Sequence, residues 1–212
     1  YNNKRVGSFG DLACFSFYAN KLITTGEGGM VLSNNKKLTK KIRSLRNLSF
    51  RSDRRFYHTE IGYNYRLTNM QAAIGISQIE NLQNHIDIKR KNTFLYNNII
   101  RKMDLPLRLP SENENSKSVF WMYGVVLKNK KLNAKILAEK LENRGIETRP
   151  LFLGMHQQPV LKKMKLFNNE KFPVTEELSR FGLYLPSGLK LNKKKIDFIC
   201  NVLKDIFHES RK

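Results

Sequence analysis

The sequence predicts a mixed α/β fold. Two short apolar runs near the start of the chain, Leu12–Tyr18 and Met30–Ser33, have the length and side chains of β-strands. In two later segments, 35–48 and 68–101, apolar residues recur every three or four positions, as they do in amphipathic helices. With 212 residues, the chain is long enough to bury a core as one large or two small domains.

The first two strands are joined by a polar loop that carries Lys21 and ends in the glycine-bearing turn Thr24–Gly29. Glycine adopts backbone conformations that other residues resist, so this turn can be tight. We therefore expect a hairpin-like unit with Lys21 at its mouth. Because the Leu12–Tyr18 run is apolar, we expect the strand and its Cys14 to be buried.

The first helix, over 35–48, is rich in lysine and arginine, and a solvated face is the usual explanation for that pattern. The second begins with the capping-box pair Thr68 and Gln71, whose side chains satisfy free backbone N–H groups. Its apolar positions continue to about Arg101, so we expect one long helix. A connector with proline and asparagine follows at 104–115, and we place a domain boundary there, giving domains 1–103 and 104–212.

The second domain is predicted to be a small α/β domain. Its expected elements are a strand over Val119–Leu127, a helix from Asn133 to Gly145, a short strand Ile146–Arg149 stopped by Pro150, a helix Pro173–Phe181, a buried edge strand Leu183–Leu185, and a last helix capped by Asn192. The inward face of the last helix is predicted to comprise Ile196, Ile199, Cys200, Leu203 and Ile206.

The chain is strongly basic, with 39 Lys and Arg against 18 Asp and Glu, a net charge of +21. Such an excess is typical of a protein that binds nucleic acid or a phosphorylated small molecule. It also fits a chain whose balancing acidic residues lie in another part of the protein. We do not expect nucleic-acid binding, because most aromatic residues lie in apolar runs rather than along a basic stripe. A hydrophobic content of 40% excludes a disordered chain. No run of residues suggests a membrane span, and we expect a cytoplasmic protein.

The two cysteines are Cys14 and Cys200, and both lie in apolar surroundings. A disulfide scaffold needs more cysteines, and a zinc site needs closer spacing. We therefore expect two buried thiols and no metal site.

Lys21 is the first candidate for chemistry. A lysine just beyond a buried strand, in a stretch with no other charge, loses part of its hydration and can act as an amine nucleophile. Ser16 could offer a hydroxyl on the same side. A lysine at a strand end is more often simply solvated, so these residues alone leave both interpretations open.

Several blocks of the sequence resemble, in order, those of the DegT/DnrJ/EryC1/StrS sugar aminotransferases. The similarity runs from about residue 6 to residue 205. The blocks are Gly7–Asp11, Phe15–Lys21, Thr24–Gly29, Gly62–Thr68 with Gln71–Ala73, and Ile146–Pro150 with His156 and Pro159.

The resemblance implies the pyridoxal-phosphate-dependent transferase fold of type I, typified by aspartate aminotransferase. It makes residues 1–103 part of the large domain and 104–212 the small domain. It implies that Lys21 bears pyridoxal 5'-phosphate and moves protons. The other implied contacts are Ser16 and Asn64 to the cofactor phosphate, Asn64 reaching the neighbouring subunit of a homodimer, and Asn20, Arg66 and His156 to the sugar substrate.

Plainer roles for three of these residues stay open. Asn64 could be an ordinary turn residue, Arg66 a brace for the loop before the long helix, and His156 a surface loop histidine. His58 is expected to be structural or exposed, and Arg149 to pair with an acid such as Glu147.

The implied reaction moves an amino group from glutamate to a nucleotide-linked 4-keto-6-deoxysugar, as in polysaccharide or O-antigen biosynthesis. The Ile146–Pro150 block is most similar to its form in GDP-perosamine synthases, which favours GDP-4-keto-6-deoxymannose; a dTDP-linked ketosugar is the alternative. Members of the family are longer at the N-terminus, so we expect a C-terminal portion of such an enzyme. A truncated or split product that needs an N-terminal partner is a further alternative.

Overall fold

The computed structural model describes residues 1–128, 131–167 and 169–210. The chain divides into two compact units. We call Tyr1–His85 with Asn113–Lys117 the N-terminal unit, and Ile86–Glu112 with Ser118–Lys212 the C-terminal unit. The domains 1–103 and 104–212 inferred from the sequence stay a prediction.

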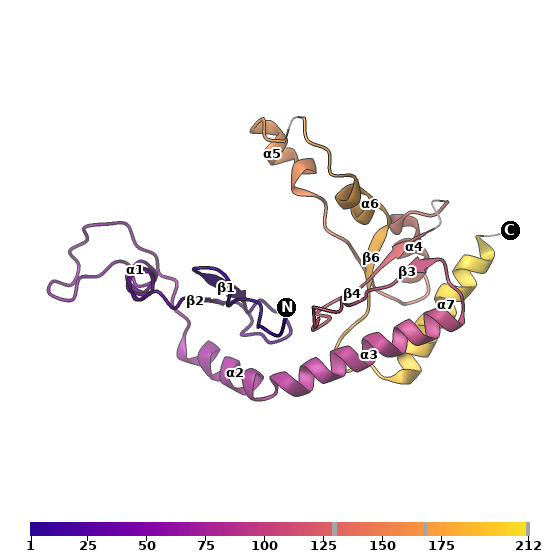
Figure 1. The fold of residues 1–212 in the computed structure, drawn as a ribbon, viewed down its shortest axis with the longest axis horizontal. Helices are drawn as coiled ribbons and strands as arrows, with labels where there is room; N and C mark the ends of the chain where they lie inside the picture. The colour runs from indigo at the N-terminus through magenta and orange to yellow at the C-terminus, as the bar shows by residue number, and fades with distance from the viewer. Residues whose placement is uncertain (129–130, 168, 211–212) are drawn as a thin grey trace. The chain divides into compact units, whose positions relative to one another are not determined.

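The N-terminal unit begins with a small antiparallel sheet (Figure 1). Strand β1 (Ala13–Ser16) pairs with β2 (Gly29–Leu32), in a register that sets Ala13 opposite Leu32. The strand expected over Leu12–Tyr18 is therefore confirmed as a strand but is shorter. The prediction that it is buried, with Cys14, is wrong, because both strands and the cysteine are largely exposed. Two strands alone leave side chains of the sheet in contact with solvent.

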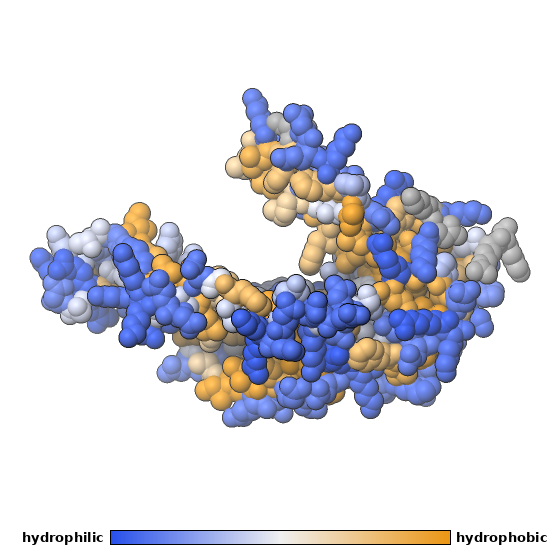
Figure 2. Space-filling model, viewed as in Figure 1, coloured by the Kyte–Doolittle hydropathy of each residue, from blue (hydrophilic) through white to orange (hydrophobic). Residues whose placement is uncertain are grey.

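Helix α1 (Lys36–Arg46) follows β2. Asn35 caps its start, since the side-chain oxygen accepts hydrogen bonds from the backbone N–H groups of Lys37 and Leu38. None of its residues is buried, and hydrophilic side chains cover it in the space-filling view (Figure 2). The expected basic, solvated helix is confirmed.

The single long helix expected from Thr68 to Arg101 is wrong in one respect, because it is interrupted at Asn81. The chain forms α2 (Asn69–Glu80) and α3 (Leu82–Lys102) instead. Asn81 donates a side-chain hydrogen bond to Ser77 O, 3.0 Å away, and asparagine favours such helix-end positions over helix interiors. The capping box is present, with Gln71 N and Thr68 Oγ1 3.2 Å apart.

The apolar residues of α2 lie largely at the surface, where Figure 2 shows hydrophobic side chains. Four of them are exposed: Met70, Ile74, Ile76 and Ile79. The helical period predicted for this segment is confirmed, but no residue of α2 is buried within the part of the chain that the structure describes.

The C-terminal unit holds a four-stranded antiparallel sheet in the order β3 (Leu107–Arg108), β4 (Tyr123–Leu127), β6 (Gly182–Leu185), β5 (Arg149–Pro150). The prediction that Leu183–Leu185 forms an edge is wrong, since β6 pairs on both sides. The strand expected over Ile146–Arg149 is instead the two residues of β5, so Pro150 lies within the strand. Because proline has no backbone N–H, it fits an edge strand, and β5 is one.

Helices of this unit bury the core against the sheet. They are α4 (Ala134–Glu142), α6 (Pro173–Phe181) and α7 (Lys193–Glu209), with η1 (Met155–Gln157) and α5 (Pro159–Lys163) between β5 and α6. The expected caps Asn133 and Asn192 are confirmed. The five predicted inward residues of α7 are all buried. Tyr96 of α3 stacks on Tyr123 of β4, with ring centroids 4.4 Å apart.

A buried lysine joins α3 to the sheet region. Lys89 is 8% exposed, and its ammonium donates hydrogen bonds to Trp121 O at 2.8 Å and Ser187 O at 2.5 Å. Burial lowers the pKa of Lys89. The next residue, Arg90, donates to both carboxylate oxygens of Glu112. Its Nη1 lies 2.6 Å from Oε1, and its Nη2 lies 3.0 Å from Oε2.

Among the described residues, none of the helices is long and apolar enough to cross a membrane. Nor do three or more His, Cys, Asp or Glu side chains gather there as a metal ion would require.

Candidate functional site

The loop between β1 and β2 carries Lys21. The backbone N–H of Lys21 donates to Tyr18 O at 2.9 Å, which turns the chain directly after the strand. Lys21 and its neighbour Asn20 are half-buried, whereas Ser16 at the end of β1 is exposed. Ser16 Oγ accepts a long hydrogen bond from Tyr18 N, 3.4 Å away, so its hydroxyl proton remains available to another acceptor.

Two threonines fix the return of this loop to β2. Thr24 Oγ1 and the N–H of Thr25 both donate to Phe17 O, each at 3.0 Å. Thr25 is buried, and its hydroxyl donates to Glu27 O at 2.6 Å. These bonds satisfy the backbone where β1 ends, so the loop that presents Lys21 is held at both ends.

The start of α2 closes against the same turn. Gly28 has a φ of +142°, and a Cβ at this position would lie 2.7 Å from Thr25 Oγ1 and 2.8 Å from Leu67 Cδ2. The Gln71 side chain, already part of the capping box, donates to Glu27 O at 3.1 Å. Only glycine fits here, and the segment before α2 thereby packs on the loop that carries Lys21.

Asn64 and Arg66 lie on the segment that leads into α2. The segment runs beside the end of α1, where Tyr63 N donates to Leu45 O and Tyr65 N to Arg46 O. Arg66 Nε lies 3.4 Å from Asn64 Oδ1. Both side chains are exposed, so their amide and guanidinium groups face solvent next to each other.

A small apolar pocket of about 180 Å³ lies where the loop meets α2, and the sequence did not predict it. The residues around it are Phe17, Ile23, Thr24, Thr25, Met30, Leu67, Ala72, Gly75, Ile76 and Ile79. Its walls come from the β1–β2 hairpin and from Leu67 with α2, two regions that are separate in the chain, which is why no local pattern could reveal it.

His156 belongs to the C-terminal unit and is buried rather than on the surface. Its Nε2 lies 3.1 Å from Glu176 Oε1 of α6, and its ring lies 4.7 Å from that of Phe172. A Cβ on Gly154 would meet the His156 ring at 2.5 Å. The sequence does not predict that Glu176 contacts His156. The only signal in the sequence is the position of Glu176 in the first turn of α6.

The structure thus places five of the six predicted site residues in the N-terminal unit: Ser16, Asn20 and Lys21 at and after the end of β1, and Asn64 and Arg66 on the segment before α2. His156 lies in the other unit. Two minor expectations concern residues outside this set. His58 is exposed as expected, and its Nδ1 lies 2.8 Å from Leu48 O. The pairing of Arg149 with Glu147 is not among the ion pairs of the described residues.

Comparison with known proteins decides the family. The model of the DegT/DnrJ/EryC1/StrS aminotransferase family matches residues 1–204. The chain belongs to this family. Its fold is accordingly that of the pyridoxal-phosphate-dependent transferases of type I, as the resemblance implied.

Individual relatives agree with this assignment. The chain is 35% identical over 208 residues to a GDP-perosamine synthase of Vibrio cholerae, covering 98% of this chain and 56% of that protein. Among solved structures it is similar to Helicobacter pylori PseC, an aminotransferase involved in the biosynthesis of pseudoaminic acid. The TM-score is 0.89 at 27% identity, covering 99% of this chain and 56% of that one.

A second solved structure carries a sugar nucleotide. It is a mutant of GDP-4-keto-6-deoxymannose-3-dehydratase with bound GDP-perosamine, similar with a TM-score of 0.82 at 26% identity, covering 96% of this chain and 57% of that one. The chain therefore spans a little more than half the length of the relatives it matches.

Pyridoxal phosphate is the cofactor of this family, and the residues present fit it. The fit rests on the donor set in the N-terminal unit. Lys21 supplies an amine on a loop held at both ends, and Ser16 supplies a hydroxyl proton at the end of β1. The Asn64 amide can donate to a phosphate oxygen. The close approach at Gly28 keeps this loop compact.

Proposed function

We propose that this chain supplies the cofactor lysine of an aminotransferase that acts on a nucleotide-linked 4-keto-6-deoxysugar. The observation that carries the proposal is the Lys21 loop, which two threonines and the close packing at Gly28 hold directly after the strand that ends at Ser16. GDP-4-keto-6-deoxymannose is the favoured substrate, giving GDP-perosamine. Three relatives named GDP-perosamine synthase, each 34–35% identical, support that choice.

Each predicted site residue is given one role in the proposed reaction. Bound pyridoxal phosphate supplies an electron sink, and glutamate is the amino donor. The Lys21 amine would hold the cofactor, take a proton from the amino-donor carbon and, in the return half-reaction, give a proton to the sugar carbon. Ser16 and Asn64 donate hydrogen bonds to the cofactor phosphate, while Asn20, Arg66 and His156 bind and orient the sugar substrate.

The site is proposed to be shared in a cytoplasmic homodimer, with Asn64 reaching the phosphate of the neighbouring subunit. Its exposed amide on the segment before α2 is compatible with such a reach. A mixed-dimer experiment tests it: Lys21→Ala and Asn64→Ala subunits are combined, each inactive alone. Recovery of part of the activity is expected, because one of the two sites then has both residues; no recovery would place Asn64 outside a shared site.

The cofactor lysine is tested without measuring activity. Protein incubated with pyridoxal phosphate is reduced with borohydride, digested and analysed by mass spectrometry. We expect the cofactor mass on the Lys21 peptide, loss of the visible absorbance band in Lys21→Ala, and no change in Lys37→Ala, which removes an exposed lysine of α1. A label on another lysine, or an unchanged band in Lys21→Ala, would refute the assignment.

A dTDP-linked ketosugar remains the alternative substrate. The two are separated by measuring amino transfer from glutamate to GDP-linked and dTDP-linked 4-keto-6-deoxysugars side by side. A higher kcat/KM for the GDP-linked sugar supports the favoured substrate, and the reverse order supports the alternative.

One observation favours a second possibility, that this chain acts only together with further protein that covers its sheet. The apolar residues of the β1–β2 sheet are exposed, including Phe15 at 42% and Leu32 at 49%. Cys14 of the same sheet reports on such a cover. Its thiol should react quickly with a maleimide in the chain alone and slowly once an N-terminal partner is bound. Equal reaction rates would exclude a cover over this sheet.

A further inference from the structure

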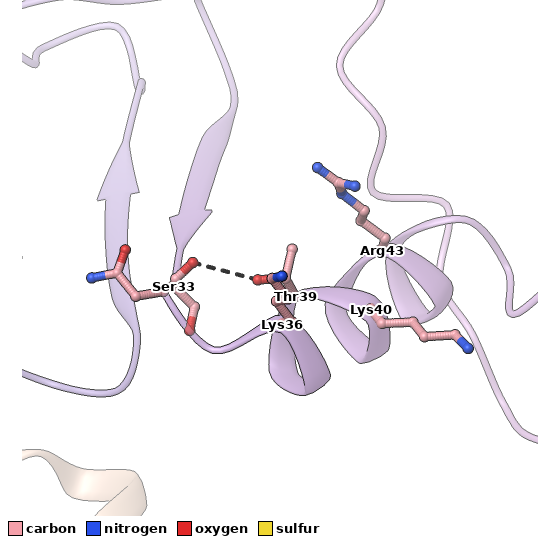
Figure 3. Close-up of a pocket in the computed structure, with 6 residues that line it drawn as sticks. Ser33, Lys36, Thr39, Lys40 and Arg43 are labelled. Atoms are coloured by element: carbon pink, nitrogen blue, oxygen red, sulfur yellow. Dashed lines mark hydrogen bonds between the residues drawn. The ribbon is translucent and has the colours of Figure 1, made fainter.

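A second pocket of the N-terminal unit has no role in the proposed reaction. It lies where the chain leaves β2 and enters α1, and its volume is about 310 Å³. Figure 3 shows side chains of α1 and the end of β2 around it. Its lining residues are Ser33, Asn34, Lys36, Thr39, Lys40 and Arg43.

Three of these side chains are cations on one face of α1. Lys36, Lys40 and Arg43 are spaced by four and three residues, which places them on the same side of a helix. Of the six cations in α1, only Lys41 is paired with an acid among the described residues, namely Glu60. Like charges at this spacing repel one another, so the row lowers the stability of α1 unless an anion is bound.

The hydroxyl groups at the pocket form its frame. Thr39 Oγ1 donates to Asn35 O at 3.0 Å and lies 3.4 Å from Ser33 O, the contact drawn in Figure 3. Ser33 Oγ donates to Asp11 O at 2.7 Å. Because these hydroxyl protons are committed to the backbone, the donors left for a ligand are the three cations and the Asn34 amide.

We propose that this pocket binds a small molecule carrying a chain of phosphoryl groups. The donors are all of the kind that phosphate oxygens accept, with a planar arginine fork and two lysine ammonium groups. Lys36 and Arg43 are separated by about 10 Å along the helix axis, so a single phosphate would not span the row. A bound polyanion would offset the repulsion along α1.

Nucleic acid is the less suitable ligand. Single strands are held by aromatic side chains that stack on the bases, and the residues that line the pocket include no aromatic ring. The proposal is independent of the reaction proposed for Lys21, because it concerns residues of α1 that are given no part in that reaction.

The experiment measures binding of inorganic tripolyphosphate to the full-length protein by calorimetry at low salt. The test variant replaces Lys36, Lys40 and Arg43 with glutamine. A matched control replaces three exposed lysines of α7, Lys194, Lys195 and Lys204, and so lowers the net charge equally. We expect about tenfold weaker binding or worse in the test variant, and at most about a twofold change in the control.

Two results would overturn the proposal. One is no binding of tripolyphosphate to the unchanged protein, including the case in which a single-stranded oligonucleotide binds through α1 instead. The other is an equal loss of binding in both variants. Circular dichroism of each variant checks that α1 is intact. The Lys21 absorbance band is recorded in parallel, so loss of cofactor binding is distinguished from loss of the α1 pocket.

Discussion

His156 Nε2 lies 3.1 Å from Glu176 Oε1, and this contact joins the turn before α5 to the first turn of α6. The imidazole is buried against the Phe172 ring, whereas the carboxylate is 44% exposed. Glu176 therefore fixes the orientation of the His156 ring, the one proposed substrate contact in the C-terminal unit. Substrate binding and local stability should both depend on it.

Removing the carboxylate should lower stability modestly. For Glu176→Ala we expect the free energy of unfolding in urea to fall by about 1 kcal/mol, since the contact with His156 and a long hydrogen bond from Phe172 N, 3.4 Å away, are both lost. Glu177→Ala is the matched control, because Glu177 lies 3.8 Å from Arg108 and both are well exposed, so its loss should cost less than about 0.5 kcal/mol. Equal losses in the two variants would contradict the structural role of Glu176.

A side chain at Gly28 should disturb the Lys21 loop. Gly28→Ala places a methyl group against Thr25 Oγ1 and Leu67 Cδ2, and we expect a loss of about 2–3 kcal/mol together with weaker cofactor binding. Gly26→Ala is the control, because Gly26 also has a positive φ of +79° but nothing lies within 4 Å of its Cβ position. It should cost about 1 kcal/mol from backbone strain alone. Cofactor titration with urea unfolding measures both effects.

The buried Lys89 should make stability rise with pH in the alkaline range. Burial lowers its folded-state pKa below the ordinary 10.5, so between these two values the unfolded chain binds more protons than the folded one. The stability of the unchanged protein relative to Lys89→Met should therefore increase from about pH 8 to about pH 10. Lys91→Met, on an exposed position of α3, should show no such change. A pH-independent difference for Lys89→Met would refute the burial effect.

Cys200 should have the opposite effect. Burial raises the pKa of this thiol from 9.0 to about 12, so the folded state keeps its proton where the unfolded chain loses it. The contribution of Cys200 to stability therefore declines as pH rises above 9.0, and Cys200→Ala should remove that contribution. Cys14→Ala, which removes an exposed thiol, is the control and should leave the decline unchanged. Unfolding is compared between about pH 8 and about pH 10.

Much of the fold could be predicted because it is encoded in short stretches. The capping box at Thr68 and the caps Asn133 and Asn192 are local hydrogen-bond patterns, and all three are present. The inward face of α7 follows from helical period alone. The break at Asn81 was missed, because the apolar period continues across it while a single side chain ends the helix.

Burial was harder to predict, because it depends on which other segments arrive. Cys14 and the β1 strand are as apolar as a core strand, yet they are exposed in a two-stranded sheet. Leu183–Leu185 was assigned to an edge, but pairing with both β4 and β5 places it inside. Neither outcome is visible in the apolar pattern of the strand itself.

Short stretches of the amino-acid sequence are enough to predict the family, the position of Lys21 after the first strand and the period of each helix, because these depend on the order of neighbouring residues. Three contacts become visible only in the folded chain: Gly28 approaches Leu67, Glu176 holds His156, and buried Lys89 donates to backbone carbonyl groups. The residues in these contacts lie between 20 and 98 positions apart in the chain. They arise from packing between segments, which local residue preferences do not specify.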